Sequence, residues 1–249
     1  MNGYKTLLQE ANDEYIVNKS RFIGSAAPVE TPEQALAFLD KIRQQYKDAT
    51  HNCYAYIIGK NAGIRFSQSL LIDEPLKFNR LAAKDGPLWA LEQEARLMRY
   101  SDDGEPGGTA GMPIIEVMKA RGVVDCAVVV TRYFGGILLG AGGLVRAYSH
   151  TCALALNAAK VCEMHPTVRY MAEVAYPLWD RVQHQLKSLP VRLENPEFTA
   201  AVAFELVMKE TDEAKVREEL TRVTDGRMEW LKTEETYSPW EEENSDGLV

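Results

Sequence analysis

Three carboxylates within four residues, Asp102, Asp103 and Glu105, form a candidate site for a divalent cation. Hard cations prefer oxygen ligands, which these side chains supply. The segment lacks the twelve-residue spacing and the terminal glutamate of a calcium loop. Asp-Gly and Glu-Pro are also turn formers, so the same carboxylates could instead cap backbone amides in a tight turn. The turn is the favoured interpretation, and no metal or other cofactor is predicted.

The acidic loop leads into a glycine-rich segment, Gly107–Gly111, which includes Thr109 and precedes a predicted helix. Free amides at the start of a helix bind phosphate and other anions. The segment does not match the GxxxxGK[ST] phosphate loop, and the second glycine cluster, Gly140–Gly143, matches neither this motif nor GxGxxG. Glycines also permit close backbone packing. The residues alone leave both interpretations open.

Arg132 follows a buried strand and precedes two aromatic residues, Tyr133 and Phe134. Such an arginine could bind a phosphate while a ring stacks on a nucleic-acid base. In the alternative, Arg132 pairs with carboxylates of the acidic loop and both rings belong to the core. Arg146, early in the next predicted helix, is a further candidate for ligand binding, or else a surface charge.

His51 and Cys53 lie two residues apart in a predicted strand, so they point to the same face. A Cys–His nucleophilic pair is conceivable on this basis. However, side chains at this spacing rarely reach attack geometry, so core packing or hydrogen bonding is favoured for both. The sequence contains neither GxSxG nor HExxH, which disfavours common hydrolase mechanisms, and no catalytic residue is assigned.

The composition indicates a cytoplasmic protein with a sizeable core. The chain has 249 residues, 46% of them hydrophobic, without a long apolar run or a signal-peptide pattern, so no membrane association is predicted. Its four cysteines form no CxxC pair, which fits reduced thiols. The net charge of −8 comes largely from Glu234–Val249, which holds six acidic and no basic residues. The remainder is nearly neutral and leaves room for a local basic patch.

Hydrophobic periodicity predicts mixed strands and helices up to Lys160. The expected strands are Glu14–Ala26, Ala49–Ile58 and Val123–Thr131, the last buried on both faces. The expected helices are Pro32 to about Tyr46 after a Thr31 cap, Pro87–Tyr100, Thr109–Ala120 and Leu144–Lys160.

Beyond Pro166 the pattern predicts the βαββαβ order of a ferredoxin-like domain. The expected elements are, in order, strand Thr167–Ala175, helix Pro177–Ser188, strand Val191–Asn195, strand Phe198–Met208, helix Asp212–Val223 and strand Arg227–Lys232. The residues after Tyr237 are expected to be a disordered acidic tail.

Several long motifs together resemble the signature of the IMPACT family. They are SDDGEP (101–106), GTAG (108–111), VVVTRYFGG (128–136), LGAGGLVRAY (139–148), KSRFIG (19–24) and ATHNCYAY (49–56). The resemblance implies an N-terminal domain related to domain IV of elongation factor G and to a ribosomal-protein domain, followed by a ferredoxin-like domain. It also implies a role in translation, which eukaryotic relatives regulate, and it supplies no established catalytic residues.

The predicted fold class is therefore α+β in two domains, residues 1–166 and 167–237, with a tail at 238–249. Residues 68–99 depart from the family pattern and are interpreted as an insertion. The predicted function is a non-enzymatic, translation-associated regulator that binds RNA or the ribosome. One alternative is an enzyme or small-ligand protein that holds a phosphorylated ligand, with or without a metal. Another is an adaptor for a protein partner.

Overall fold

The computed structural model describes residues 3–59 and 97–240. The chain divides into two compact units, one of residues 5–162 and one of residues 163–249 together with residues 1–4. Each unit is built on an antiparallel sheet with helices, so the predicted α+β class is confirmed. Among the described residues, no helix is long and apolar enough to cross a membrane.

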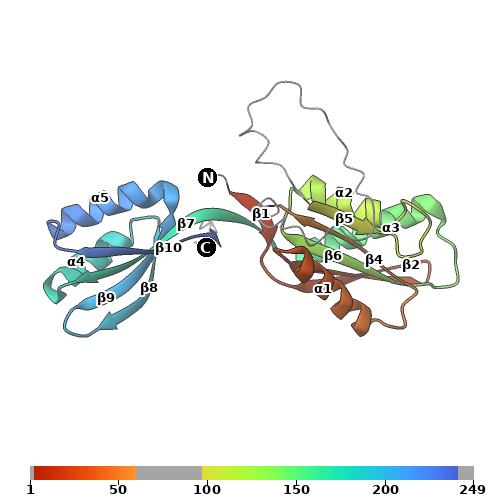
Figure 1. Ribbon diagram of the computed structural model, residues 1–249, viewed down its shortest axis with the longest axis horizontal. Coiled ribbons are helices and arrows are strands. Elements are labelled where there is room, and N and C mark those ends of the chain that lie inside the picture. The colour runs from red at the N-terminus through yellow and green to blue at the C-terminus, as the bar shows by residue number, and fades with distance from the viewer. Residues whose placement is uncertain (1–2, 60–96, 241–249) are drawn as a thin grey trace, which may run out of the picture. The chain divides into compact units, whose positions relative to one another are not determined.

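The sheet of the first unit has the strand order β2-β3-β6-β4-β5, with every pair antiparallel. Helix α1 packs on one face of this sheet, and α2 and α3 pack on the other (Figure 1). The elements of this part of the chain are β1 (Tyr4–Leu7), β2 (Ala11–Val17), β3 (Ser20–Pro28), α1 (Pro32–Gln45), β4 (His51–Ile58), β5 (Leu97–Ser101), α2 (Gly111–Arg121), β6 (Cys126–Tyr133) and α3 (Gly140–Ala158).

Helix α1 begins where the sequence predicts it. The Thr31 hydroxyl accepts a hydrogen bond from the Gln34 amide, and Pro32 occupies the first turn. Its apolar side packs on Tyr56 and Ile58 of β4. The predicted alternation of β4 is also confirmed, because Cys53 faces α3 while Tyr56 faces α1.

Two predictions in this unit are wrong. The expected strand Glu14–Ala26 is a hairpin of β2 and β3, because Asn18 and Lys19 take left-handed φ values of 46° and 62° and reverse the chain. The expected helix Pro87–Tyr100 is wrong at its C-terminal end, because Leu97–Ser101 form strand β5, which pairs with β4. Residues 60–96, which include most of that helix and of the predicted insertion, lie outside the described residues.

Three elements of the motif region, β6, α3 and α2, begin or end at residues other than those predicted. Strand β6 continues through Arg132 and Tyr133, which were expected in a turn, because β3 and β4 pair with it as far as these residues. Helix α3 begins at Gly140, so the glycine cluster forms its first turn. Helix α2 begins at Gly111, two residues later than expected.

The second unit has the predicted βαββαβ order, with strands arranged as β10-β7-β9-β8. Helices α4 and α5 bury Trp179, Val182 and Leu220 against one face of this sheet. Pro166, where the domain boundary was expected, lies inside β7, and β10 extends to Pro239 in the predicted tail. The elements are β7 (Val161–Val174), α4 (Tyr176–Leu186), β8 (Val191–Phe198), β9 (Val202–Lys209), α5 (Glu213–Thr224) and β10 (Glu229–Pro239).

Candidate functional site

Asp102 caps the start of helix α2. One carboxylate oxygen accepts hydrogen bonds from the amides of Ala110 (3.0 Å) and Gly111 (2.8 Å), and the other accepts one from Gly108 (2.8 Å). A negative charge at this position also complements the helix dipole. The capping interpretation of Asp102 is therefore confirmed. An external phosphate would have to displace this carboxylate to reach the same amides.

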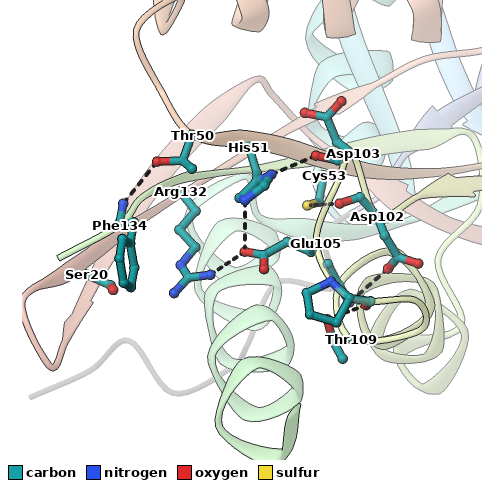
Figure 2. Close-up of polar contacts among 12 residues, drawn as sticks. Ser20, Thr50, His51, Cys53, Asp102, Asp103, Glu105, Thr109, Arg132 and Phe134 are labelled. Carbon is teal, nitrogen blue, oxygen red and sulfur yellow. Dashed lines mark hydrogen bonds and ion pairs between the residues drawn. The ribbon is translucent and has the colours of Figure 1, made fainter. Parts of the chain in front are cut away.

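Asp103 fixes the orientation of His51. Its backbone carbonyl lies 2.7 Å from His51 Nδ1, so this nitrogen carries the proton as donor. The Asp103 carboxylate accepts a hydrogen bond from the backbone amide of Asn52 at 2.6 Å and lies 3.4 Å from Arg43 Nη2. The other ring nitrogen, His51 Nε2, is thereby turned toward Glu105 at 4.0 Å (Figure 2).

Glu105 is the buried centre of the network. Its Oε1 accepts a hydrogen bond from Arg132 Nη1 at 2.5 Å and another from the Tyr148 hydroxyl at 2.8 Å. In Figure 2 the side chains of Arg132 and His51 both point toward this carboxylate. An ion pair removed from water needs such additional hydrogen bonds to offset its desolvation. The structure thus brings the acidic loop, β4 and β6 together at one carboxylate.

Arg132 is only 5% exposed, and its guanidinium lies near two aromatic rings. Its Cζ is 5.3 Å from the ring centroid of Phe22 and 5.4 Å from that of Phe134. Nη1 is bonded to Glu105, whereas the buried Nε has no hydrogen-bond partner in the structure. A buried donor without an acceptor costs about 1–3 kcal/mol. Arg132 Nε is therefore an unused buried donor in this site.

Cys53 and Tyr148 complete the network as neutral groups. The thiol donates to the Asp102 carbonyl (2.9 Å) and lies 3.4 Å from the Tyr148 hydroxyl oxygen. Burial raises the pKa of Cys53 to about 12, and burial followed by the neighbouring Cys53 raises that of Tyr148. Because the thiolate is the nucleophile, a protonated Cys53 is a poor one at neutral pH.

A cavity of about 380 Å³ opens beside this network, and both polar and apolar side chains line it. Polar groups at its base are His51, Glu105 and Arg132. Apolar side chains form its rim, among them Phe134, which is 45% exposed, and Leu138, which is 85% exposed. The full lining is Thr50, His51, Gly104, Glu105, Pro106, Arg132, Phe134, Leu138, Leu139, Gly140, Ala141 and Leu144.

Five of the predicted binding residues do not line this cavity: Asp102 and Asp103, whose contacts are given above, and Thr109, Tyr133 and Arg146. Thr109 is buried, and its hydroxyl donates to the Pro106 carbonyl at 2.7 Å. Tyr133 alternates with Arg132 along β6, so it points to the α1 face, where its hydroxyl donates to Asp48 at 2.9 Å. Arg146 is exposed and lines a neighbouring hollow of about 520 Å³ with Tyr15 and His150.

Two aromatic side chains of the site, Tyr148 and Phe22, were not considered in the sequence analysis, and Phe134 was considered there only as one of two rings beside Arg132. Tyr148 lies on the apolar side of α3, where a tyrosine hydroxyl needs a partner, and this pattern was the available signal. Phe134 follows Arg132 by two residues, directly after β6, and its ring centroid lies 5.4 Å from Arg132 Cζ, as extended-strand spacing would allow. Phe22 comes from β3 and has no comparable local signal.

Gly135 joins two motifs that are distant in sequence. A Cβ at this position would lie 2.0 Å from the backbone carbon of Lys19, so only glycine fits. The Gly135 amide also donates to the Ser20 hydroxyl at 3.1 Å, and the Phe134 amide donates to Thr50 at 3.2 Å. The loop after β6 is therefore attached to both neighbouring strands.

No group of three or more His, Cys, Asp or Glu side chains in the described part of the chain has the geometry to hold a metal ion. The acidic loop explains this, because Asp102, Asp103 and Glu105 point in different directions toward amides and Arg132.

Comparisons with known proteins cover nearly the whole chain. Residues 18–156 match the model of the Impact N-terminal domain, and residues 173–227 match a domain of unknown function, DUF1949. The chain is 34% identical to the IMPACT family member YvyE of Bacillus subtilis, covering 95% of this chain and 94% of that protein. It is 29% identical to YigZ of Escherichia coli over 88% of this chain and 92% of the relative.

A eukaryotic relative matches about half of the chain. Protein IMPACT of Oryctolagus cuniculus is 32% identical over 124 residues, which are 49% of this chain and 29% of that protein. A crystal structure titled as a hypothetical protein superposes with a TM-score of 0.51 at 27% identity, covering 94% of this chain and 98% of the other. The resemblance expected from the motifs is thereby confirmed: the chain belongs to the IMPACT family.

Proposed function

We propose that this protein is a non-enzymatic regulator of translation that binds RNA or the ribosome through the rim of the Arg132 cavity. Its relationship to proteins named IMPACT supports a regulatory role, since the family resemblance implies control of translation. The neutral state of Cys53 supports binding over nucleophilic chemistry.

The observation that carries the proposal is the half-exposed ring of Phe134 at the mouth of the cavity. Aromatic rings with one open side serve as stacking platforms for unpaired bases. The ring is supported from behind by the Arg132 guanidinium, and its backbone is held by Thr50. A base stacked on Phe134 would therefore meet a surface that is already ordered.

Two exposed cations lie on the elements next to this platform, and both are suited to phosphates. Lys19 is in the β2–β3 turn that contacts Gly135, and Arg146 is in the first turns of α3. Residues 5–162 hold 18 basic and 17 acidic residues, so this part of the chain does not repel a polyanion as a whole. Phosphate contacts at the rim would add to stacking at the centre.

The test is an electrophoretic shift assay with single-stranded RNA, together with co-sedimentation with ribosomes, each at 50 and 200 mM salt. Replacement of Phe134 by Ala should weaken binding about 5- to 150-fold, the range expected for one stacked base. Replacement of Arg146 by Ala should lower the slope of log affinity against log salt by about 0.7.

Matched controls come from the second unit. Phe198→Ala removes another exposed ring, and Arg181→Ala removes another exposed cation; neither should change binding. Thermal unfolding confirms that each variant is folded. Absence of both RNA and ribosome binding at 50 mM salt would refute the proposal, and equal losses for test and control variants would place binding elsewhere on the chain.

A further inference from the structure

We propose that the uncovered face of the second unit's sheet docks a basic peptide segment of a protein partner. This inference is independent of RNA or ribosome binding by the first unit. Helices α4 and α5 cover one face of the β10-β7-β9-β8 sheet. Among the described residues, no helix packs on the opposite face, which we call the open face.

The centre of the open face is apolar and exposed. Met171 of β7 and Leu231 of β10 are directly opposite each other in the strand register, and their exposed fractions are 49% and 64%. Neighbouring residues on the helical side, such as Tyr170 and Ala172, are buried in the core. The alternation of strand residues therefore puts these two large side chains in solvent, on the edge strand β10 and the adjacent strand β7.

Carboxylates surround this apolar centre in an unusual arrangement. Glu173 is directly opposite Glu229, and Glu194 is directly opposite Glu205. Like charges in opposed positions destabilise a sheet. Glu197, opposite Ala203, adds another carboxylate to the same face.

One of the two glutamate pairs has a cation within the protein, and the other has none. Arg169 contacts Glu205, lies 2.7 Å from Glu194 and lies 3.7 Å from Glu234. No ion pair to Glu173 or Glu229 occurs in the described part of the chain, and both are exposed. The repulsion in this second pair would be relieved by a lysine or arginine from outside.

Charge and chemistry select a basic peptide over other occupants. Residues 163–249 hold 19 acidic and 10 basic residues, so RNA or a second copy of this chain would meet like charge. Tyr170, Phe204 and Trp230, which could stack on bases, pack on the helical side. A segment with cations on either side of an aliphatic residue fits both the glutamate pairs and the Met171–Leu231 centre.

The probe is the fluorescein-labelled peptide Lys-Leu-Lys-Leu-Lys, and its binding to the full chain is measured by fluorescence anisotropy at 50 and 200 mM salt. Glu-Leu-Glu-Leu-Glu and Lys-Gly-Lys-Gly-Lys serve as comparison peptides. We expect binding of the first peptide, no binding of the acidic one and weaker binding of the glycine one. The double variant Glu173→Gln, Glu229→Gln should weaken binding roughly 2- to 30-fold, as expected for the loss of two exposed ion pairs.

The matched control is Asp180→Asn with Glu218→Gln, which removes the same charge from exposed positions on α4 and α5. Leu231→Ser tests the apolar centre, with the exposed Leu36→Ser on α1 as its control. The proposal fails if the two double variants weaken binding equally, because attraction would then be to net charge alone. It also fails if the Glu173 and Glu229 variant changes RNA binding or self-association instead of peptide binding.

Discussion

Arg132 and Arg169 each lie in an interior strand of an antiparallel sheet. Arg132 is on a face that helices cover, whereas Arg169 is on a face that no described helix covers. Arg132 lies under α3 with 6% of its side chain exposed, and its ion-pair partner is Glu105. Arg169 lies on the open face with 30% exposed and contacts Glu194, Glu205 and Glu234. The buried arginine thus has fewer carboxylates around it than the partly exposed one.

The difference shows that the count of ion pairs is a poor guide to their effect on stability. Breaking a buried pair leaves a charge without water or partner and costs about 3–5 kcal/mol. An exposed pair contributes about 0.2–1 kcal/mol, because water screens it. The Arg132 network should therefore hold the first unit together, whereas the Arg169 cluster leaves its face available to a partner.

The largest contrast between the units should appear at alkaline pH. Burial raises the pKa of Cys53 and Cys152 to about 12 and raises that of Cys126 as well, and all three lie in the first unit. In the unfolded chain a thiol ionises near pH 8.5. Because the folded state keeps these thiols protonated, their stabilising effect is complete below about pH 8.5 and is lost as pH rises toward 12.

The expected loss is on the order of 1.4 kcal/mol per pH unit for each thiol. Hydrogen exchange measured by mass spectrometry between pH 8 and pH 10 separates the units, with correction for the intrinsic exchange rate. Protection of β6 should fall faster than protection of β9. The variant Cys126→Ala should reduce the slope in β6, and an equal loss of protection in β6 and β9 would contradict the assignment to thiols.

Glu105→Ala tests the buried network directly. It leaves the Arg132 guanidinium and the Tyr148 hydroxyl without their acceptor, and we expect the first unit to lose about 3–5 kcal/mol of unfolding free energy. Hydrogen exchange of the β6 amides, recorded across a chemical denaturation series, measures this loss of unfolding free energy. Glu105→Gln keeps an acceptor and should cost clearly less; an equal cost for both variants would mean that shape, and not hydrogen bonding, decides the effect.

Asp102→Ala should have an intermediate effect. It removes the acceptor for three amides at the start of α2, a change that costs about 0.5–2 kcal/mol for a helix cap. The same variant frees these amides for an external anion. Thermal unfolding with and without 50 mM sulfate measures both effects, and sulfate should stabilise the variant more than the parent. No difference in the sulfate response would show that the amides are not accessible.

Glu205→Ala should have the smallest effect, below about 1 kcal/mol, because Arg169 is partly exposed to water and keeps Glu194 and Glu234. Tryptophan fluorescence is suitable for the measurement, since Trp179 and Trp230 lie in the second unit. A loss as large as that of Glu105→Ala would break the comparison between the two arginines.

The sequence predicted those parts of the site that depend on local pattern. The shared face of His51 and Cys53 follows from strand alternation, and the capping role of Asp102 follows from turn chemistry before a helix. The pairing of Arg132 with the acidic loop was one of two alternatives, and the structure assigns it to Glu105. The βαββαβ order was predicted because its elements are regular and joined by short connections.

The errors occur where distant contacts override the local pattern. Leu97–Ser101 continues a helical spacing from Leu88, Leu91 and Ala95, yet it forms a strand because β4 offers an antiparallel partner. Tyr148 lies 43 residues from Glu105, and their contact depends on how α3 packs on the sheet. No spacing rule contains such information.

The backbone contact between Gly135 and Lys19 has a consequence for the kinetics of binding at the cavity rim. Two consecutive amides of this loop, Phe134 and Gly135, are already held by Thr50 and Ser20. A ligand that stacks on Phe134 therefore orders little additional backbone, and the entropic cost of association is small. Association should then be rapid and occur in one step, so that ligands of different affinity differ mainly in their residence time on the protein.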